Sequence, residues 1–196
     1  MRNLINFVLF QAVWFAAVGG AAAGMLWIGP AAGFAFLLAH LYMTPPDRRR
    51  YELRYVLVIT VVGALLDSAF RAFELTNYPT SEGAWPSAVA WLAPGWIVSL
   101  WLAFACLPRF SLGWMAGKPW LGAVFGAIGG PLSYYGGVRM GAVALHPDAW
   151  PTILALSLEY AVAMPILMRF SEQTQGDVPV ADRVPTRTES ASVVSD

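Results

Sequence analysis

The stretch "GALLDSAFRAFE", residues 63–74, places an acid and a base one helical turn apart within a long apolar segment. At about 100° per residue, Asp67 and Arg71 share one helical face with Thr60, Gly63, Ala64 and Glu74. The larger apolar side chains of the segment fall mostly on other faces. Because an ion that faces lipid is costly, this stripe is predicted to face the interior of a helix bundle or a wet cavity.

The composition of the whole chain is that of a membrane protein. Of its 196 residues, 58% are hydrophobic and 12% are charged, and mean hydropathy is +0.57. A soluble domain of this length could not bury so much apolar surface. The net charge of zero gives no reason to expect a nucleic-acid partner. A lone cysteine, Cys106, excludes an intrachain disulfide, and His40 and His146 lack a zinc-type spacing, so we expect no metal and no cofactor.

Six apolar segments predict an all-α fold, a six-transmembrane-helix bundle within residues 1–170. Each segment has about 20 residues, enough to cross a hydrocarbon core of about 30 Å. Pro94 and Pro131 should kink the fourth and fifth segments. The polar residues 171–196 are predicted to form a disordered cytoplasmic tail. The six segments are 4–24, 26–44, 53–73, 87–106, 119–138 and 150–169.

Basic residues predict the orientation of the helices. With the N terminus in the cytoplasm, only Arg71 and Arg139 of the twelve lysines and arginines fall on the other side. This asymmetry predicts that both termini are cytoplasmic. An alternative stays open for the first segment, since "AAVGGAAAG" contains small residues suited to cleavage of a signal peptide.

Small residues recur along the fifth segment. Gly122, Gly126 and Gly130 are spaced every four residues, and Ser133, Gly137 and Gly141 extend the ridge. Such a ridge lets two helix backbones approach closely, so we expect a packing seam. Gly-Pro pairs begin "GPAAGFAF" at Gly29 and "GPLSYYGG" at Gly130. They leave open an inverted repeat like those of transporters.

Polar side chains within the predicted spans suggest a cluster in the outer half of the bundle. Asp67, Arg71, Arg139 and Glu159 would make it neutral, and Tyr134 lies beside them in sequence. Glu159 has no base within one turn, so it needs a partner on another helix, water or a proton. Two interpretations stay open: the charges fix the helices in register, or they line a cavity for a lipid head or a small amphipathic solute.

Three other polar residues are expected to have structural roles. Asn6 and Gln11 should form hydrogen bonds between helices. His40 lies near the cytoplasmic end of the second segment, far from the proposed cluster.

Several motifs resemble a family of small bacterial inner-membrane proteins of unknown function. They are "LLDS" at 65–68, "APGWIVSLWLAF" at 93–104, "SLGW" at 111–114, "GAIGGPLSYYGGVRMGA" at 126–142 and the acid in "LSLEYAV" at 156–162. The resemblance implies a multi-pass protein of the bacterial inner membrane with one domain, and it implies no reaction. The residues that match the family pattern include Asp67, Ser68, Trp96, Trp101, Pro131, Tyr134, Arg139 and Glu159.

These observations favour a protein that binds a membrane lipid or a small amphipathic ligand and presents it to a membrane-protein partner. Asp67 and Arg71 would contact the head group, while Tyr134 and Arg139 would orient it. Trp96 and Trp101 would line the apolar part of the site. A small secondary transporter with Glu159 as proton carrier, a membrane-embedded lipid-modifying enzyme with Asp67 or Glu159 as acid or base, and a structural subunit stay open as alternatives.

Overall fold

A computed structural model describes residues 1–176, so residues 177–196 of the predicted tail lie outside the described part of the chain. The described residues form six α-helices, four short 3-10 turns and one pair of two-residue strands. The helices are α1 (Arg2–Ala22), α2 (Ile28–Met43), α3 (Arg49–Ala72), α4 (Gly95–Ala105), α5 (Pro119–Met140) and α6 (Ala149–Gly176). The turns are η1 (Pro46–Arg48), η2 (Pro79–Ser81), η3 (Ser87–Val89) and η4 (Gly113–Met115), and strand β1 (Thr76–Asn77) pairs antiparallel with β2 (Ala144–Leu145).

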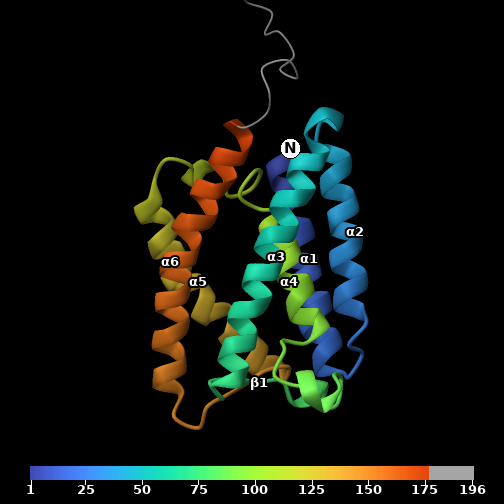
Figure 1. The fold of residues 1–196 in the computed structure, drawn as a ribbon, viewed down its shortest axis with the longest axis vertical. Coiled ribbons are helices and arrows are strands. Elements are labelled where there is room, and N and C mark those ends of the chain that lie inside the picture. The colour runs from blue at the N-terminus through green and yellow to red at the C-terminus, as the bar shows by residue number, and fades with distance from the viewer. Residues whose placement is uncertain (177–196) are drawn as a thin grey trace, which may run out of the picture.

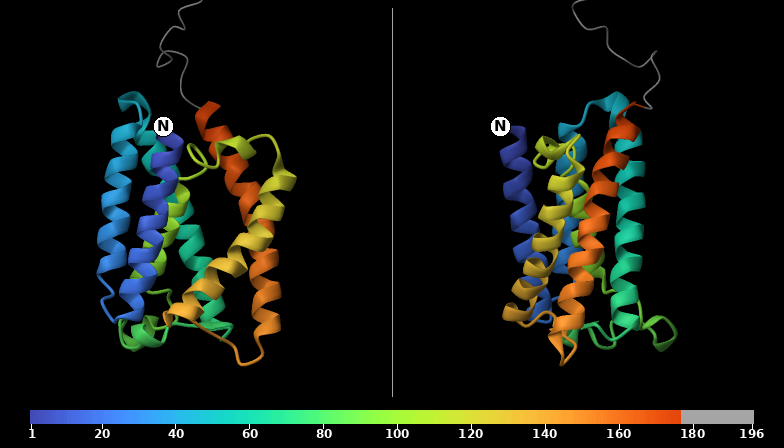
Figure 2. Two further views of the ribbon diagram at one scale, coloured as in Figure 1. Left: turned by 180° about the vertical axis from the view of Figure 1, so that it is seen from behind. Right: turned by 90° about the vertical axis from the view of Figure 1, so that its left-hand side faces the viewer.

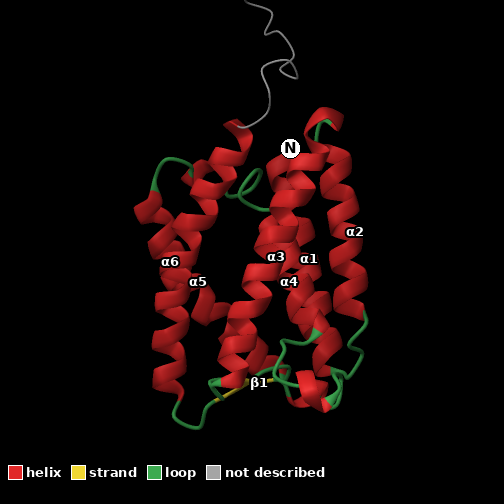
Figure 3. Cartoon of the chain, in the orientation of Figure 1, coloured by secondary structure: helices red, strands yellow, loops and turns green. Residues whose placement is uncertain are grey.

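Successive helices run in opposite directions along one bundle (Figures 1 and 3). One end of the bundle, here called the terminal end, holds the N terminus, the α2–α3 and α4–α5 connections and the end of α6. The other end, here called the sheet end, holds the strand pair and the α1–α2, α3–α4 and α5–α6 connections. The predicted helical class is therefore confirmed. The α1–α2, α2–α3 and α5–α6 connections are short, which accounts for the antiparallel order of these pairs.

Three helical segments are long and apolar enough to cross a membrane: Arg2–Ala22, Pro46–Ala72 and Ala149–Glu172. Helices α2 and α4 are apolar but shorter. Helix α6 continues to Gly176, so the domain boundary predicted at residue 170 falls inside a helix.

The predicted fourth span, 87–106, is wrong in its first eight residues. Helix α4 begins only at Gly95 and has 11 residues. Pro94 is its N-cap in extended conformation, so it starts the helix and does not kink it. The proline ring also disfavours helical geometry at the residue before it, Ala93. Pro131, by contrast, lies inside α5 as expected.

The predicted face of α3 is buried up to Asp67 and Ser68, while Leu57, Val61 and Leu65 on its other faces are exposed. Glu74, which the periodicity places on the same face as Asp67, lies beyond the helix end and has a φ of 59°. The backbone N–H of Leu75 reaches back to the carbonyl of Phe70 over 2.9 Å, as at many helix C termini. The helical stripe therefore stops near Arg71.

The glycine ridge of α5 packs against α6. Gly122, Gly126 and Gly130 are all buried. A Cβ atom at Gly126 would overlap the backbone carbonyl of Tyr160, and one at Gly130 would lie 2.5 Å from the Tyr160 ring. Only glycine permits this approach, so the ridge holds α5 to α6 as the packing interpretation predicts.

We expect Gly126→Ala to weaken the α5–α6 contact, since the new methyl group meets backbone atoms that cannot rotate away. Overpacking of this kind costs about 1–3 kcal/mol. Gly129→Ala is the matched control, because a Cβ there meets only the Phe125 ring, at 3.8 Å. Thermal unfolding of both variants in the same detergent measures the difference. Equal melting temperatures for the two variants would contradict this account of the ridge.

Candidate functional site

The carboxylate of Asp67 is the centre of a buried hydrogen-bond network. Its side chain is 3% exposed. Trp101 Nε1 donates to Oδ2, while the hydroxyls of Tyr134 and Tyr78 donate to Oδ1, the latter over 3.2 Å. The donors belong to α4, α5 and the segment after β1. Hydrogen bonds to a charged acceptor are the strong ones, so this network joins four parts of the chain through one side chain.

Gly63 makes room for one of these donors, Trp101. It lies one turn before Asp67 on the same face of α3, and a Cβ there would overlap the Trp101 indole. The indole therefore lies directly against the α3 backbone, which brings its N–H to Asp67. The other face of Trp101 stacks on the ring of Tyr160, with centroids 5.6 Å apart and an interplanar angle of 14°.

A cavity of about 450 Å³ lies beside this network, between α1, α4, α5 and α6. Its wall is mainly apolar and aromatic, as is usual for small-molecule sites. Among the described residues that line it, Asp67 alone carries a charge. The polar side chains besides Asp67 are Gln11, Ser133, Tyr134 and Tyr160, together with the indoles of Trp14 and Trp101.

The mouth of the cavity lies between α1 and α5. Several lining residues are also exposed on the outside of the bundle: Phe15 on α1 is 57% exposed, and Phe125 and Leu132 on α5 are 44% and 64% exposed. Figure 2 shows α5 slanting across the bundle, close to α1 at the sheet end and away from it at the terminal end. In the half of the bundle nearer the sheet end, Trp14 Nε1 donates to Ser133 Oγ over 2.9 Å. The cavity therefore opens sideways, through an apolar rim.

Sequence comparison places the chain in a family but gives it no activity. The profile of the family described as "Protein of unknown function (DUF2878)" matches residues 3–166. The chain belongs to this family. No curated protein and no solved structure matches it. The expected membership of a family of unknown function is confirmed, and function has to be argued from the site itself.

Three of the predicted site residues of this DUF2878 chain come together. Asp67, Trp101 and Tyr134 form one network and all line the cavity. Trp96 does not line it. Its indole N–H donates to Ser81 Oγ over 3.1 Å, and its ring meets Tyr78 edge-on at 5.6 Å. Trp96 therefore holds the segment after β1 in place.

The two predicted bases do not join the acids. Arg71 donates to the carbonyl of Leu92 over 2.9 Å and lies 5.8 Å from the centroid of the Tyr78 ring. Arg139 is exposed in the last turn of α5. Within residues 1–176, neither arginine forms an ion pair with Asp67 or Glu159. The neutral cluster of two acids and two bases is thus absent from this part of the chain, because aromatic donors satisfy Asp67 and both arginines lie at helix ends.

Glu159 lies apart from the cavity wall on α6. Its Oε1 atom is buried and has no hydrogen-bond partner among the described residues. The sequence left three possibilities for Glu159: a partner on another helix, water or a proton. No described helix supplies a partner to this oxygen.

Sequence reasoning missed Tyr78 and Tyr160. Tyr78 lies in the connection after β1, where no periodicity indicates which side chains turn inward. Tyr160 directly follows Glu159 in a helix whose apolar residues give no clear face. Gln11, expected to bond another helix, makes no hydrogen bond to a described residue and instead lines the cavity.

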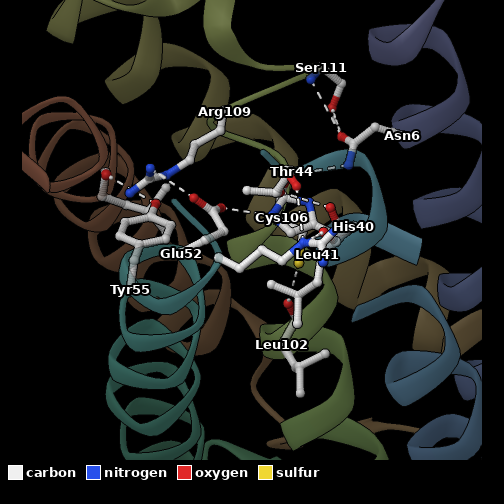
Figure 4. Close-up of polar contacts among 12 residues, drawn as sticks. Asn6, His40, Leu41, Thr44, Glu52, Tyr55, Leu102, Cys106, Arg109 and Ser111 are labelled. Atoms are coloured by element: carbon white, nitrogen blue, oxygen red, sulfur yellow. Dashed lines mark hydrogen bonds and ion pairs between the residues drawn. The ribbon is translucent and has the colours of Figure 1, made fainter. Parts of the chain in front are cut away.

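A second buried polar network lies at the terminal end (Figure 4). Glu52 is 1% exposed; its Oε1 lies 2.7 Å from His40 Nε2 and its Oε2 lies 2.8 Å from Arg109. The Arg109 guanidinium also lies over the Tyr55 ring, 4.6 Å from its centroid. Burial lowers the pKa of Arg109 and the Glu52 carboxylate beside it raises it. A guanidinium stays charged under such opposing effects.

Asn6 extends the connections at this end, as the sequence predicts. Its Nδ2 donates to the carbonyl of Cys106 over 3.3 Å, and its Oδ1 accepts from the hydroxyl of Ser111 over 2.8 Å. Helix α1 is thereby tied to the α4–α5 connection. Together, the networks of Glu52 and Asn6 fix the terminal ends of α1, α2 and α3 around Arg109 and its neighbours.

We expect Asp67→Ala to destabilise the protein strongly, because three buried donors lose their acceptor. Each unsatisfied group costs about 1–3 kcal/mol. Arg139→Ala is the comparison, since an exposed change of this kind stays within about 0.5 kcal/mol. Unfolding by a denaturing detergent, followed by tryptophan fluorescence, measures both. Equal losses of stability in the two variants would contradict the central place of Asp67 in the hydrogen-bond network.

We expect Glu52→Gln to cost about 3–5 kcal/mol, since it breaks a buried ion pair and leaves Arg109 without its carboxylate. The control is Asp47→Asn, which removes an exposed pairing with Arg48 at 3.9 Å and should cost at most about 1 kcal/mol. The same unfolding assay compares them. A Glu52→Gln variant as stable as the control would show that the buried network contributes little.

Proposed function

We propose that the protein is a multi-pass protein of the bacterial inner membrane, with six spans and both termini in the cytoplasm. The three long apolar helices and the alternating directions of all six support this. In the described part of the chain, only Arg71 and Arg139 lie at the sheet end. The other basic residues lie at the terminal end, as the positive-inside rule requires. They are Arg2, Arg48, Arg49, Arg50, Arg54, Arg109, Lys118 and Arg169.

Exposed tryptophans support the same placement. Trp27, Trp85, Trp91 and Trp150 lie in or beside the connections of the sheet end, while Trp114 and Trp120 lie at the α4–α5 connection of the terminal end. Two separated sets of exposed indoles are typical of the two membrane interfaces. Helix α4 is too short to cross a membrane alone. The segment 76–94, which precedes it, lies at the sheet end of the bundle.

The function that the geometry supports best is binding of a lipid-like molecule that enters the cavity from the bilayer. The observation that carries it is the apolar cavity of about 450 Å³ with its apolar mouth between α1 and α5. This volume lies within the range of about 300–1,000 Å³ that small-molecule sites occupy. In a membrane, the exposed rim residues face acyl chains, so an apolar molecule reaches the cavity without crossing water.

The polar end of such a molecule would lie near Asp67. Trp101 and Tyr134 hold this carboxylate at the cavity wall, and no basic side chain within residues 1–176 lines the cavity. Arg71 and Arg139, first expected to contact a head group, therefore have no place in the proposed contact. The ligand is held mainly by its apolar part, with Asp67 as the polar anchor.

One observation favours a second candidate, a small proton-coupled transporter. The buried Oε1 of Glu159 lacks a hydrogen-bond partner in the described residues. A proton carrier needs a carboxyl that changes its protonation during the cycle. If this candidate is correct, Glu159→Gln abolishes proton-coupled flux, whereas lipid binding in the cavity stays nearly intact.

We expect Gly129→Leu to block lipid binding. Gly129 lines the cavity, and a Cβ there meets only the Phe125 ring, so the larger side chain extends into the cavity without striking backbone. Labelling in membranes by a photoactivatable long-chain alcohol, read by mass spectrometry of cavity peptides, should fall at least about tenfold, which corresponds to about 1.4 kcal/mol.

The control is Val124→Phe on the same helix. Val124 is 53% exposed and does not line the cavity, so labelling of the cavity peptides should stay at the wild-type level. Undiminished labelling of the cavity peptides in Gly129→Leu would rule out the cavity as the binding site.

A further inference from the structure

The cavity wall carries a particular set of unused polar groups. Within the described part of the chain, the Gln11 carboxamide and the Tyr160 hydroxyl have no hydrogen-bond partner, although both residues line the cavity. Ser133 Oγ accepts from Trp14, which leaves its own proton to donate. Tyr160 and Asp67 both contact the Trp101 indole, one by stacking and one by a hydrogen bond, so these two residues lie at the same ring.

Asp67 has room for one further donor. A carboxylate offers about four lone-pair sites, and Trp101, Tyr134 and Tyr78 occupy three of them. A ligand group that donates to Asp67 and accepts from the Tyr160 hydroxyl would give each of these two residues a further partner. A hydroxyl is the smallest uncharged group that does both.

We infer that the ligand is a single-chain lipid with an uncharged hydroxyl head. The inference rests on the proposed function and specifies the substrate class of the same cavity. A volume of about 450 Å³ lies in the lower half of the range for drug-sized ligands, so it suits one hydrocarbon chain and not a two-chain phospholipid. The nine aromatic rings of the wall contact the chain, and the small glycines of α5 leave space for it.

The charge of the wall argues against ionised head groups. A phosphate would meet the Asp67 carboxylate, and the described part of the chain puts no lysine, arginine or histidine on the wall to offset the repulsion. An ammonium group carries only donors, so it would leave the N–H groups of Gln11 and the hydroxyl proton of Tyr160 unmatched. Moving a full charge into an apolar cavity also costs far more than moving a hydroxyl.

The test compares four probes that share one chain: hexadecanol, hexadecyl phosphate, hexadecylamine and hexadecane. Each competes with a photoactivatable alcohol for labelling of the cavity peptides in lipid nanodiscs that contain the full chain. We expect hexadecanol to compete at concentrations at least about tenfold lower than the other three. Stronger competition by the phosphate, by the amine or by the alkane overturns the inference.

Two variants test whether polar groups of the cavity wall cause the preference for hexadecanol. Tyr160→Phe removes one hydroxyl and should weaken hexadecanol several-fold while leaving hexadecane unchanged. Asp67→Asn should bring the competing concentrations of hexadecanol and hexadecyl phosphate closer together. Asp148→Asn, which removes an exposed acid outside the cavity, should leave their ratio unchanged. Because Asp67→Asn disturbs three buried donors, Tyr160→Phe keeps the test decisive if the former fails to fold. A Tyr160→Phe variant with unchanged preference contradicts the inference.

The failure of this inference is distinguishable from failure of the proposed function. An ionised probe could compete more strongly than hexadecanol and lose this competition in Gly129→Leu. That result would support lipid binding in the cavity and contradict the hydroxyl head group. If no probe competes in a Gly129-dependent way, lipid binding in the cavity falls, and the inference falls with it.

Discussion

A carboxylate enclosed by apolar helices has to obtain its hydrogen bonds from the protein, and Asp67 obtains three. Its donors, Trp101, Tyr134 and Tyr78, come from three separate parts of the chain. Their positions are therefore tied to one another through a single side chain. Gly63 belongs to the same constraint, since only a residue without a Cβ lets the Trp101 indole lie on α3 and reach Asp67. These hydrogen bonds offset the cost of burying the carboxylate, which explains why an acid is tolerated here.

The cavity follows from the way in which α5 is held. Its glycines fit it closely to α6, and the Tyr134 hydroxyl ties its second half to Asp67. Only its sheet end meets α1, where Trp14 bonds Ser133. The two helices diverge from there towards the terminal end (Figure 2), and the exposed apolar rim lies along this gap. The Glu52 network fixes the terminal ends of α2 and α3 independently, so the opening between α1 and α5 does not leave the bundle loose.

The sequence predicted most of the fold and part of the site. Periodicity placed Asp67 on the buried face of α3, because an ion avoids lipid, and the glycine spacing predicted the α5–α6 seam. It put Trp101 and Tyr134 in the same site but did not show that they bond Asp67, because a periodicity pattern treats aromatic residues as apolar. It missed Tyr78, which follows a strand of two residues. Arg71 was expected to neutralise the acid, but at the helix end a backbone carbonyl is within its reach. The predicted kink at Pro94 is wrong because hydropathy alone extended the fourth segment back to residue 87. The helix begins only after this proline, which limits the conformation of the residue before it.

The central claim is that a cavity beside Asp67 admits molecules from the surrounding bilayer. A photoreactive benzophenone amino acid in place of Phe104, which lines the cavity from α4, tests it in intact membranes. The same replacement at Phe36, buried on α2 and absent from the cavity wall, is the reference position. After irradiation, mass spectrometry should find lipid-sized adducts at position 104 and none at position 36. Crosslinks at position 104 that join only residues of the protein itself would contradict the account.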